Sequence, residues 1–214
     1  MTDAINFNDH ANTQLNDELQ SCVDTTGVFP MFRHPLFVTI YSEKMNSMIN
    51  TMVNQRKKYF QKLNFVEKVH FVERMFQFEY LVKHFDQFSV LKEVEQWQLI
   101  DYVWTNSENP SVNLSLWESI FSLMPVSPFK ETTQYEKMKS EIVLYRGGNR
   151  EGLSWTSNKD QAIWFANRFK SYDQEPMVWE VKINKNDIYH YTDSRGEDEF
   201  IVDSSLTKNA FRII

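Results

Sequence analysis

The stretch of sequence that decides the fold is IVLYRGG at residues 142–148, followed by GLSWTS at residues 152–157. Both segments hold β-branched and aromatic residues bounded by glycine, a pattern typical of two short strands joined by a turn. Four of the chain's five glycines lie in these segments and in RGEDE at residues 195–199. Because glycine permits a positive φ and lets a ligand approach the backbone closely, this concentration indicates a specialised site.

Short β-branched and aromatic segments continue through the rest of the chain and predict a compact, mostly antiparallel β core. One helix is expected within this core, over residues 159–170, with Ser157 or Asn158 as its N-cap and Ala162 and Ala166 facing inward. The expected strands are residues 142–145, 153–156, 177–183, 188–191, 200–202 and 211–214.

Apolar residues recur at three- and four-residue intervals between positions 36 and 123, which predicts a series of helices. The first residues are instead rich in Asn, Asp, Thr and Gln and predict a loose arm that can hold a short helix over residues 13–22. We therefore expect an α+β protein with a helical N-terminal region followed by the β core. Its three parts are a flexible polar arm at residues 1–25, a helical region at 26–135 and the core at 136–214.

Composition narrows the class of protein. With 214 residues, 42% of them hydrophobic and 24% charged, the chain can bury one large core or two small ones. A net charge of −6 disfavours binding to nucleic acid, because that binding depends on Lys and Arg neutralising phosphates. We expect no membrane span and no secretory signal, since the chain has no run of about 18 apolar residues and begins with a polar segment.

Cys22 is the only cysteine, which excludes a disulfide framework and fits a reducing, cytoplasmic compartment. No metal site is expected, because the five histidines are scattered and no Cys/His cluster is present. The abundance of Asn, Lys and Phe suits a low-GC microbial or viral genome, and a viral protein would work in the host cytoplasm. The sequence leaves the oligomeric state open.

Two neighbouring features suit the binding of an anionic dinucleotide. Arg146 follows the apolar run and ends a buried strand, where a guanidinium presents a planar fork to two phosphate oxygens. Ser154 and Thr156 stand two residues apart on the next strand, so both hydroxyls face one side and can orient a ribose or a carboxylate. Each feature also has a purely structural interpretation, as an ion-pair arginine or as ordinary strand hydroxyls.

Glu197 and Glu199 lie two residues apart as an extended strand begins, so their side chains point the same way with Cα atoms about 6–7 Å apart. Placed around a reacting sugar, one carboxylate can stabilise an oxocarbenium-like transition state while the other accepts a proton from the nucleophile. The alternative is a solvated acidic turn. We expect Arg146 and Glu199 to share one cleft.

Taken together and in this order, these elements resemble the arginine–serine–glutamate class of ADP-ribosyltransferases. The resemblance rests on the arginine strand, the hydroxyl strand before a helix of the form Ala162-x-x-Phe165-Ala166, and the Glu-x-Glu pair. It covers residues 142–203. The chain differs from the family's usual pattern in placing Trp155 where distance to the helix would put the first serine, and in placing Arg146 and the hydroxyl strand only eight residues apart.

The resemblance implies NAD as substrate and a macromolecular acceptor, with protein arginine as the first choice because Glu197 is associated with arginine modification. It implies that Glu199 is catalytic, and that Trp155 or Phe165 packs on the nicotinamide or supports the strand. The residues implied to contact NAD are Arg146, Gly147, Ser154, Trp155, Thr156 and Phe165. Two alternatives remain open: an NAD glycohydrolase with the same site, and a catalytically silent interaction or inhibitor protein.

Overall fold

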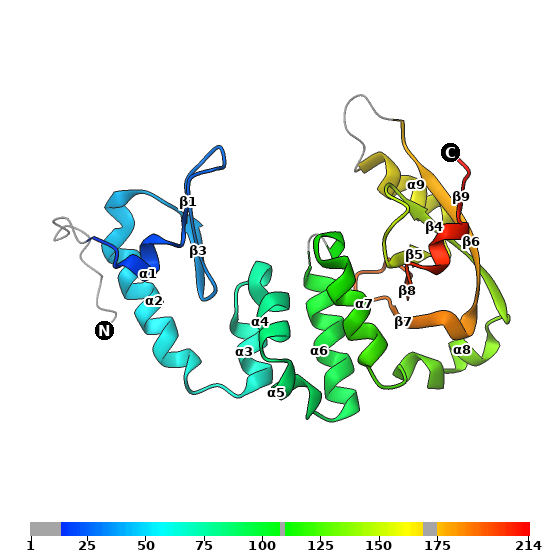
Figure 1. Cartoon of the computed structure of the whole chain (residues 1–214), viewed down its shortest axis with the longest axis horizontal. Helices are drawn as coiled ribbons and strands as arrows, with labels where there is room; N and C mark the ends of the chain where they lie inside the picture. Colours follow the sequence, from blue (N-terminus) through cyan, green and yellow to red (C-terminus); the bar gives the residue numbers. More distant parts are fainter. Residues whose placement is uncertain (1–13, 108–109, 169–174) are drawn as a thin grey trace. The chain divides into compact units, whose positions relative to one another are not determined.

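The structure is a computed structural model that describes residues 14–107, 110–168 and 175–214. The chain forms two compact units, Met1–Val90 and Leu91–Ile214. Figure 1 shows a small sheet with helices in the first unit and a larger sheet with helices in the second. Within the described residues, no helix has the length and apolar character needed to span a membrane.

The first unit begins with a sheet that the sequence did not predict. Strands β1 (Val23–Asp24), β2 (Met31–His34) and β3 (Phe37–Ile40) pair antiparallel in that order. Helices α1 (Asp17–Gln20) and α2 (Asn46–Phe60) pack on this sheet. The shared core contains Leu15, Leu19, Phe32, Ile49 and Val53. The expectation of a flexible arm at residues 1–25 is therefore wrong for residues 14–24, which form α1 and β1 and bury Leu15 and Leu19, while residues 1–13 lie outside the described part.

The helical stripe at residues 65–80 forms separate short helices instead of one. Helix α3 (Phe65–Phe71) ends where Val72 and Glu73 turn to ψ values of 138°. After this break the chain continues through η2 (Arg74–Phe76), α4 (Gln77–Lys83) and α5 (Phe85–Ser89), and α4 and α5 meet at His84. One further short element, η1 (Glu43–Met45), precedes α2.

In the second unit, helices α6 (Glu93–Asn106) and α7 (Leu114–Leu123) precede the main sheet. Their aromatic side chains interlock: the ring of Trp104 lies 5.0 Å from that of Trp117 and 5.5 Å from that of Phe121. These helices belong to the same compact unit as the main sheet, Leu91–Ile214, whereas the sequence-based division placed them in the helical region at 26–135. Short elements complete the link to the sheet: η3 (Pro110–Asn113), η4 (Pro128–Glu131) and α8 (Thr133–Lys137).

The main sheet has six strands in the order β7-β8-β5-β4-β6-β9, and every neighbouring pair is antiparallel. The α+β class and the mostly antiparallel core are therefore as predicted. The strands are β4 (Glu141–Gly147), β5 (Ser154–Thr156), β6 (Val178–Asn184), β7 (Ile188–Thr192), β8 (Glu199–Val202) and β9 (Phe211–Arg212), with η5 (Lys185–Asp187) and η6 (Leu206–Asn209) between them.

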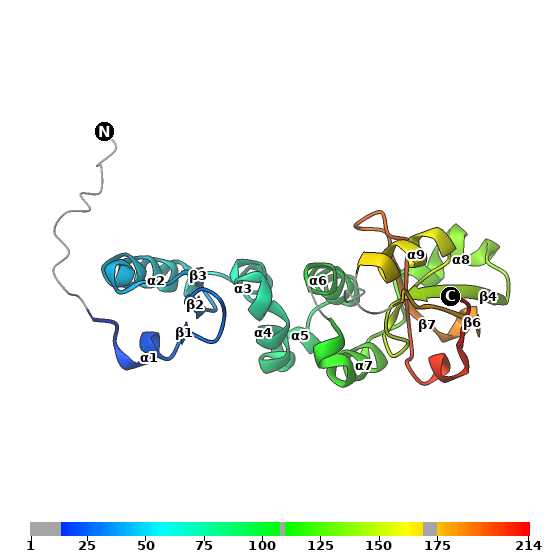
Figure 2. The same cartoon turned by 90° about the horizontal axis from the view of Figure 1, so that it is seen from above.

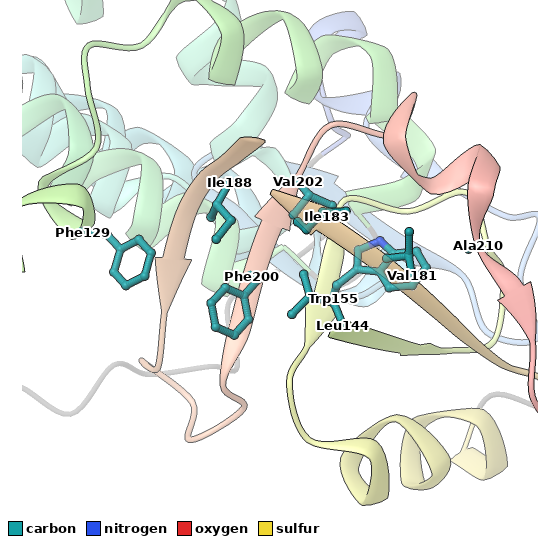
Figure 3. Close-up of a cluster of buried hydrophobic side chains, with 9 residues drawn as sticks. All are labelled: Phe129, Leu144, Trp155, Val181, Ile183, Ile188, Phe200, Val202 and Ala210. Carbon is teal, nitrogen blue, oxygen red and sulfur yellow. The ribbon is translucent and has the colours of Figure 1, made fainter. Parts of the chain in front are cut away.

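The hydrophobic core of the second unit includes Leu144, Trp155, Val181 and Phe200. Figure 3 shows Trp155, Leu144 and Val181 close together. A second cluster joins Ala162 and Ala166 of α9 (Lys159–Arg168) to Val178, and half-buried Tyr145 packs against it. Figure 2 shows α9 lying beside β4. The helix begins as predicted, because the Asn158 side chain accepts from the Asp160 and Gln161 N–H groups at 3.0 and 3.3 Å.

Gly147 allows α9 to pack this closely against β4. A Cβ at this position would overlap the carbonyl of Ala162 and the backbone nitrogen of Ala166. Only glycine therefore fits between the strand and the helix backbone. Gly147 thus has a structural role, and its contact with NAD stays a prediction.

Candidate active site

The three segments singled out by the sequence lie on adjacent strands. β5 pairs with β4 on one side and with β8 on the other, so the arginine, hydroxyl and glutamate strands are consecutive in the sheet. Tyr145 lies opposite Thr156, and Thr156 lies opposite Glu199. Residues directly opposite one another share a face, so these three form one row.

Glu199 is a buried carboxylate held by two donors. Its side chain is 6% exposed. The indole N–H of Trp104 donates to Oε1 at 3.0 Å, and Nη2 of Arg195 lies 3.3 Å from Oε2. A buried carboxylate needs such partners, because an unpaired charge away from water is very unfavourable. The carboxylate is therefore fixed in position at the start of β8.

Glu197 lies closer to solvent, with 25% of its side chain exposed, and Arg195 Nη2 lies 2.8 Å from its Oε2. Burial raises the pKa of Glu197 above its usual value, and the negative charge of Glu199 adds to this, while the positive charge of Arg195 opposes it. The two carboxylates predicted to work as a pair are thus brought together, with one arginine nitrogen between them.

The turn that carries these glutamates is tightly anchored. Gly196 has a φ of 67° and donates its N–H to the carbonyl of Asp193 at 2.9 Å. Asp198 also has a positive φ, 45°, and accepts hydrogen bonds from the backbone N–H and the hydroxyl of Ser157. The acidic turn is therefore bonded to the segment that starts α9 and is not a freely solvated loop.

Arg146 bonds to the connection between β4 and β5. Its Nε donates to the carbonyl of Asn149 at 2.6 Å, and Nη1 donates to the carbonyl of Ser154 at 2.5 Å. A Cβ at Gly152 would overlap the guanidinium, so this glycine makes room for it. Burial lowers the pKa of Arg146 to about 10, and the nearby negative charge of Glu199 partly offsets that effect. The group is therefore still protonated at neutral pH.

Arg146 and Glu199 lie near each other but not in one row. Arg146 follows Tyr145, so the strand register places it in the row next to that of Glu199 and facing the other side of the sheet. The two-residue period of the strand sends consecutive side chains to opposite faces, which is why Arg146 is not in the row of Glu199. Arg146 on β4 and Glu199 on β8 are separated by β5, and the guanidinium lies in the β4–β5 connection, where the charge of Glu199 still acts on its pKa. The shared cleft stays a prediction.

The other predicted contact residues have structural surroundings. Trp155 is 1% exposed and donates its indole N–H to the carbonyl of Gly152 at 2.8 Å, so it supports the strand and offers no surface to a nicotinamide. The hydroxyl of Thr156 donates to Gln161 Oε1 at 3.2 Å and bonds the start of α9. Ser154 shares the Thr156 face by alternation. Phe165 is half-buried on α9 with its ring 4.9 Å from that of Trp164.

Helix α6 supplies site residues that the sequence analysis missed. Besides Trp104, the carbonyl of Thr105 accepts from Arg195 Nη1 at 3.2 Å, and Asp101 Oδ2 accepts from the Ser194 hydroxyl at 2.9 Å. Burial alone would raise the pKa of Asp101, but hydrogen bonds from His190, Thr192 and Ser194 outweigh it and lower that pKa. The signal in the sequence was an aspartate inside an apolar stripe, one helical turn before a tryptophan.

Asp101, His190 and Ser127 form a row of polar side chains between α6, β7 and the segment before η4. His190 Nε2 lies 3.7 Å from Asp101 Oδ1, and its Nδ1 lies 2.7 Å from the hydroxyl of Ser127. The order Ser–His–Asp is that of many hydrolases. Here, however, Ser127 is 2% exposed and its Oγ already accepts from the N–H of Phe129 at 3.2 Å, so a substrate carbonyl has no access to it. This polar row lies where α6 meets β7.

Comparisons with protein-family models, with curated proteins and with solved structures find no match to this chain. In the part of the chain that the structure describes, no group of three or more His, Cys, Asp or Glu side chains is arranged to hold a metal ion. The assignment of function therefore rests on the site itself.

Replacing Trp104 with Phe should lower the free energy of unfolding of the second unit by about 1–3 kcal/mol, because Glu199 Oε1 loses its indole donor while remaining buried. Denaturant unfolding at neutral pH measures this. Trp179→Phe is the matched control, since that indole donates at 2.8 Å to the neutral carbonyl of Gly148 in a less buried place. Equal losses in both variants would contradict a special role for the Trp104–Glu199 bond.

Proposed function

We propose that this protein is an NAD-dependent mono-ADP-ribosyltransferase that modifies a macromolecular target, with protein arginine as the acceptor. The observation that carries the proposal is the pair of carboxylates at the start of β8. One is buried and fixed by an indole donor, and the other is more exposed with a raised pKa. Two carboxylates in different environments suit two different tasks at one reacting sugar.

The state of Arg146 supports an anionic ligand. Its hydrogen-bond partners are the neutral carbonyls of Asn149 and Ser154, and among the described residues its Nη2 group has no acceptor and forms no ion pair. A half-buried guanidinium that forms no ion pair of its own is a suitable site for a phosphate. Because Arg146 stands one residue from the end of β4, a pyrophosphate can bind Nη2 from the end of that strand.

In the proposed reaction, the ribose that carries nicotinamide lies against Glu199. As the bond from nicotinamide to the anomeric carbon breaks, the nicotinamide leaves with the bonding electrons and positive charge develops on the sugar. The Glu199 carboxylate stabilises that charge electrostatically. Glu197 accepts the proton that the acceptor nitrogen loses as its bond to the anomeric carbon forms.

A second candidate function is favoured by the hydrogen bonds of Arg146. A guanidinium bonded to two carbonyls of its own connection, with Gly152 fitted against it, is also what a purely structural arginine would show. Together with the burial of Trp155, this favours a catalytically silent member of the fold that acts as an interaction or inhibitor protein.

One experiment separates the candidates. The purified chain is incubated with NAD labelled in the adenine half, alone and with cell lysate, while nicotinamide release and label on macromolecules are followed. Nicotinamide release with transfer of label supports the transferase, and release without transfer indicates an NAD glycohydrolase. The silent protein is indicated by no release and no NAD-induced rise in melting temperature, since any ligand that binds the native state stabilises it.

The raised pKa of Glu197 predicts a pH dependence. Burial and the charge of Glu199 place this pKa above 4.5, and only the ionised carboxylate accepts a proton. Transfer to an arginine acceptor should therefore fall on acidification with an apparent pKa above 4.5. The measurement is kcat/KM for transfer as a function of pH, alongside Glu197→Gln. A profile with the same acid limb in that variant would assign the titration to another group.

A further inference from the structure

A guanidinium from the chain itself already occupies the carboxylate pair. Arg195 Nη2 lies 2.8 Å from Glu197 Oε2 and 3.3 Å from Glu199 Oε2, so a single nitrogen bridges both side chains. A guanidinium in contact with both carboxylates is the arrangement that an acceptor arginine would need in the proposed reaction. In this structure the position is filled from within the chain.

The three side chains lie at increasing depth. Arg195 is 37% exposed, Glu197 25% and Glu199 6%. The arginine is thus on the solvent side of the carboxylates. Its other terminal nitrogen, Nη1, donates to the carbonyl of Thr105 on α6 at 3.2 Å. This bond connects the arginine to the helix. An incoming guanidinium meets Arg195 before it meets the glutamates.

The site can release Arg195 without losing its shape. Glu199 keeps the indole N–H of Trp104 on its other oxygen, and the turn remains fixed by the bond from Ser194 to Asp101. Exchange of one guanidinium for another also preserves the number and charge of the hydrogen bonds to the two carboxylates. The contact is therefore one that an arginine acceptor can replace.

We infer that Arg195 is an internal competitor of the acceptor: its guanidinium fills the acceptor subsite between Glu197 and Glu199, and an arginine substrate binds by displacing it. This inference rests on the proposed function and adds a property of the same site. The affinity for acceptors is set by the fraction of time that Arg195 is out of the subsite, because apparent affinity is reduced by the fraction of competent molecules. A residue that only held the turn in place would have the opposite effect when removed.

The test uses the full chain with NAD and agmatine, a small guanidino acceptor, and measures KM for agmatine, kcat for transfer and nicotinamide release. Arg195→Gln should lower KM for agmatine about tenfold, as expected if the wild-type subsite is free about a tenth of the time. Arg195→Lys should give an intermediate KM, because an ammonium keeps the charge but cannot span the carboxylates and the Thr105 carbonyl together. Arg212→Gln is the matched control, since that arginine pairs with exposed Glu175.

The outcomes separate this inference from the proposed function. If Arg195→Gln and Arg195→Lys release nicotinamide but show an unchanged or higher KM for agmatine, Arg195 is a positioning residue and the inference is wrong, while the transferase stands. A variant that does not fold is recognised by its lost thermal transition. The other variant then shows whether KM for agmatine falls or rises. If the wild type releases no nicotinamide at all, the proposed function fails and the inference fails with it.

Discussion

Glu199→Gln is expected to reduce nicotinamide release from NAD about 1000-fold while leaving NAD binding in place. Glutamine has the same shape, and its amide oxygen can still accept the N–H of Trp104, so the site keeps its geometry. It carries no negative charge to stabilise the sugar as nicotinamide leaves, and fixed electrostatic groups of this kind are worth about 10²–10³ in rate. The measurements are nicotinamide release over time and the NAD-induced shift in melting temperature.

Glu118→Gln is a matched control for this substitution. Glu118 lies in the same unit and also accepts a hydrogen bond, from the backbone N–H of Ser204 at 3.2 Å, which is not a bond of the acidic turn. The Glu118→Gln variant should release nicotinamide at the wild-type rate. Undiminished turnover in Glu199→Gln would remove this residue from the chemistry, and a lost NAD-induced shift would assign it to binding.

The sheet and its helix could be predicted because their signals are local. β-branched and aromatic runs marked each strand within two residues of its observed bounds, and the asparagine cap marked the start of α9. The predicted Glu-x-Glu spacing also placed both carboxylates beside each other. Which face each residue takes was harder, because strand alternation separates Arg146 from Glu199 and this depends on a register that no single segment defines.

The part played by α6 could not be read from its own pattern. Trp104 and Asp101 lie in an apolar stripe that predicts a buried helix face, and nothing local shows that this face meets an acidic turn about ninety residues later. The polar composition of the N-terminal segment was misleading for a similar reason. The segment has few apolar residues, yet two of them, Leu15 and Leu19, are buried by contacts with residues of β2 and α2.

Arg146→Met is expected to have two separate effects. The variant keeps most of the apolar side chain but leaves the carbonyls of Asn149 and Ser154 without their donor, which should lower the free energy of unfolding by about 2 kcal/mol. If Nη2 binds the pyrophosphate, NAD affinity should also fall about 100-fold, the equivalent of roughly 2.8 kcal/mol for a charged, two-oxygen contact. Denaturant unfolding measures the first effect and NAD titration the second.

Arg150→Met separates these effects from a general loss of charge. Arg150 lies in the same connection between β4 and β5. Its guanidinium, however, lies over the Trp179 ring, 5.5 Å from the ring centre. This control should bind NAD as the wild type does. If Arg146→Met binds NAD as well as the wild type does, Arg146 has only a structural role. If folded Arg146→Met binds NAD more weakly while Arg150→Met binds it as the wild type does, the result would instead support a phosphate site at the end of β4.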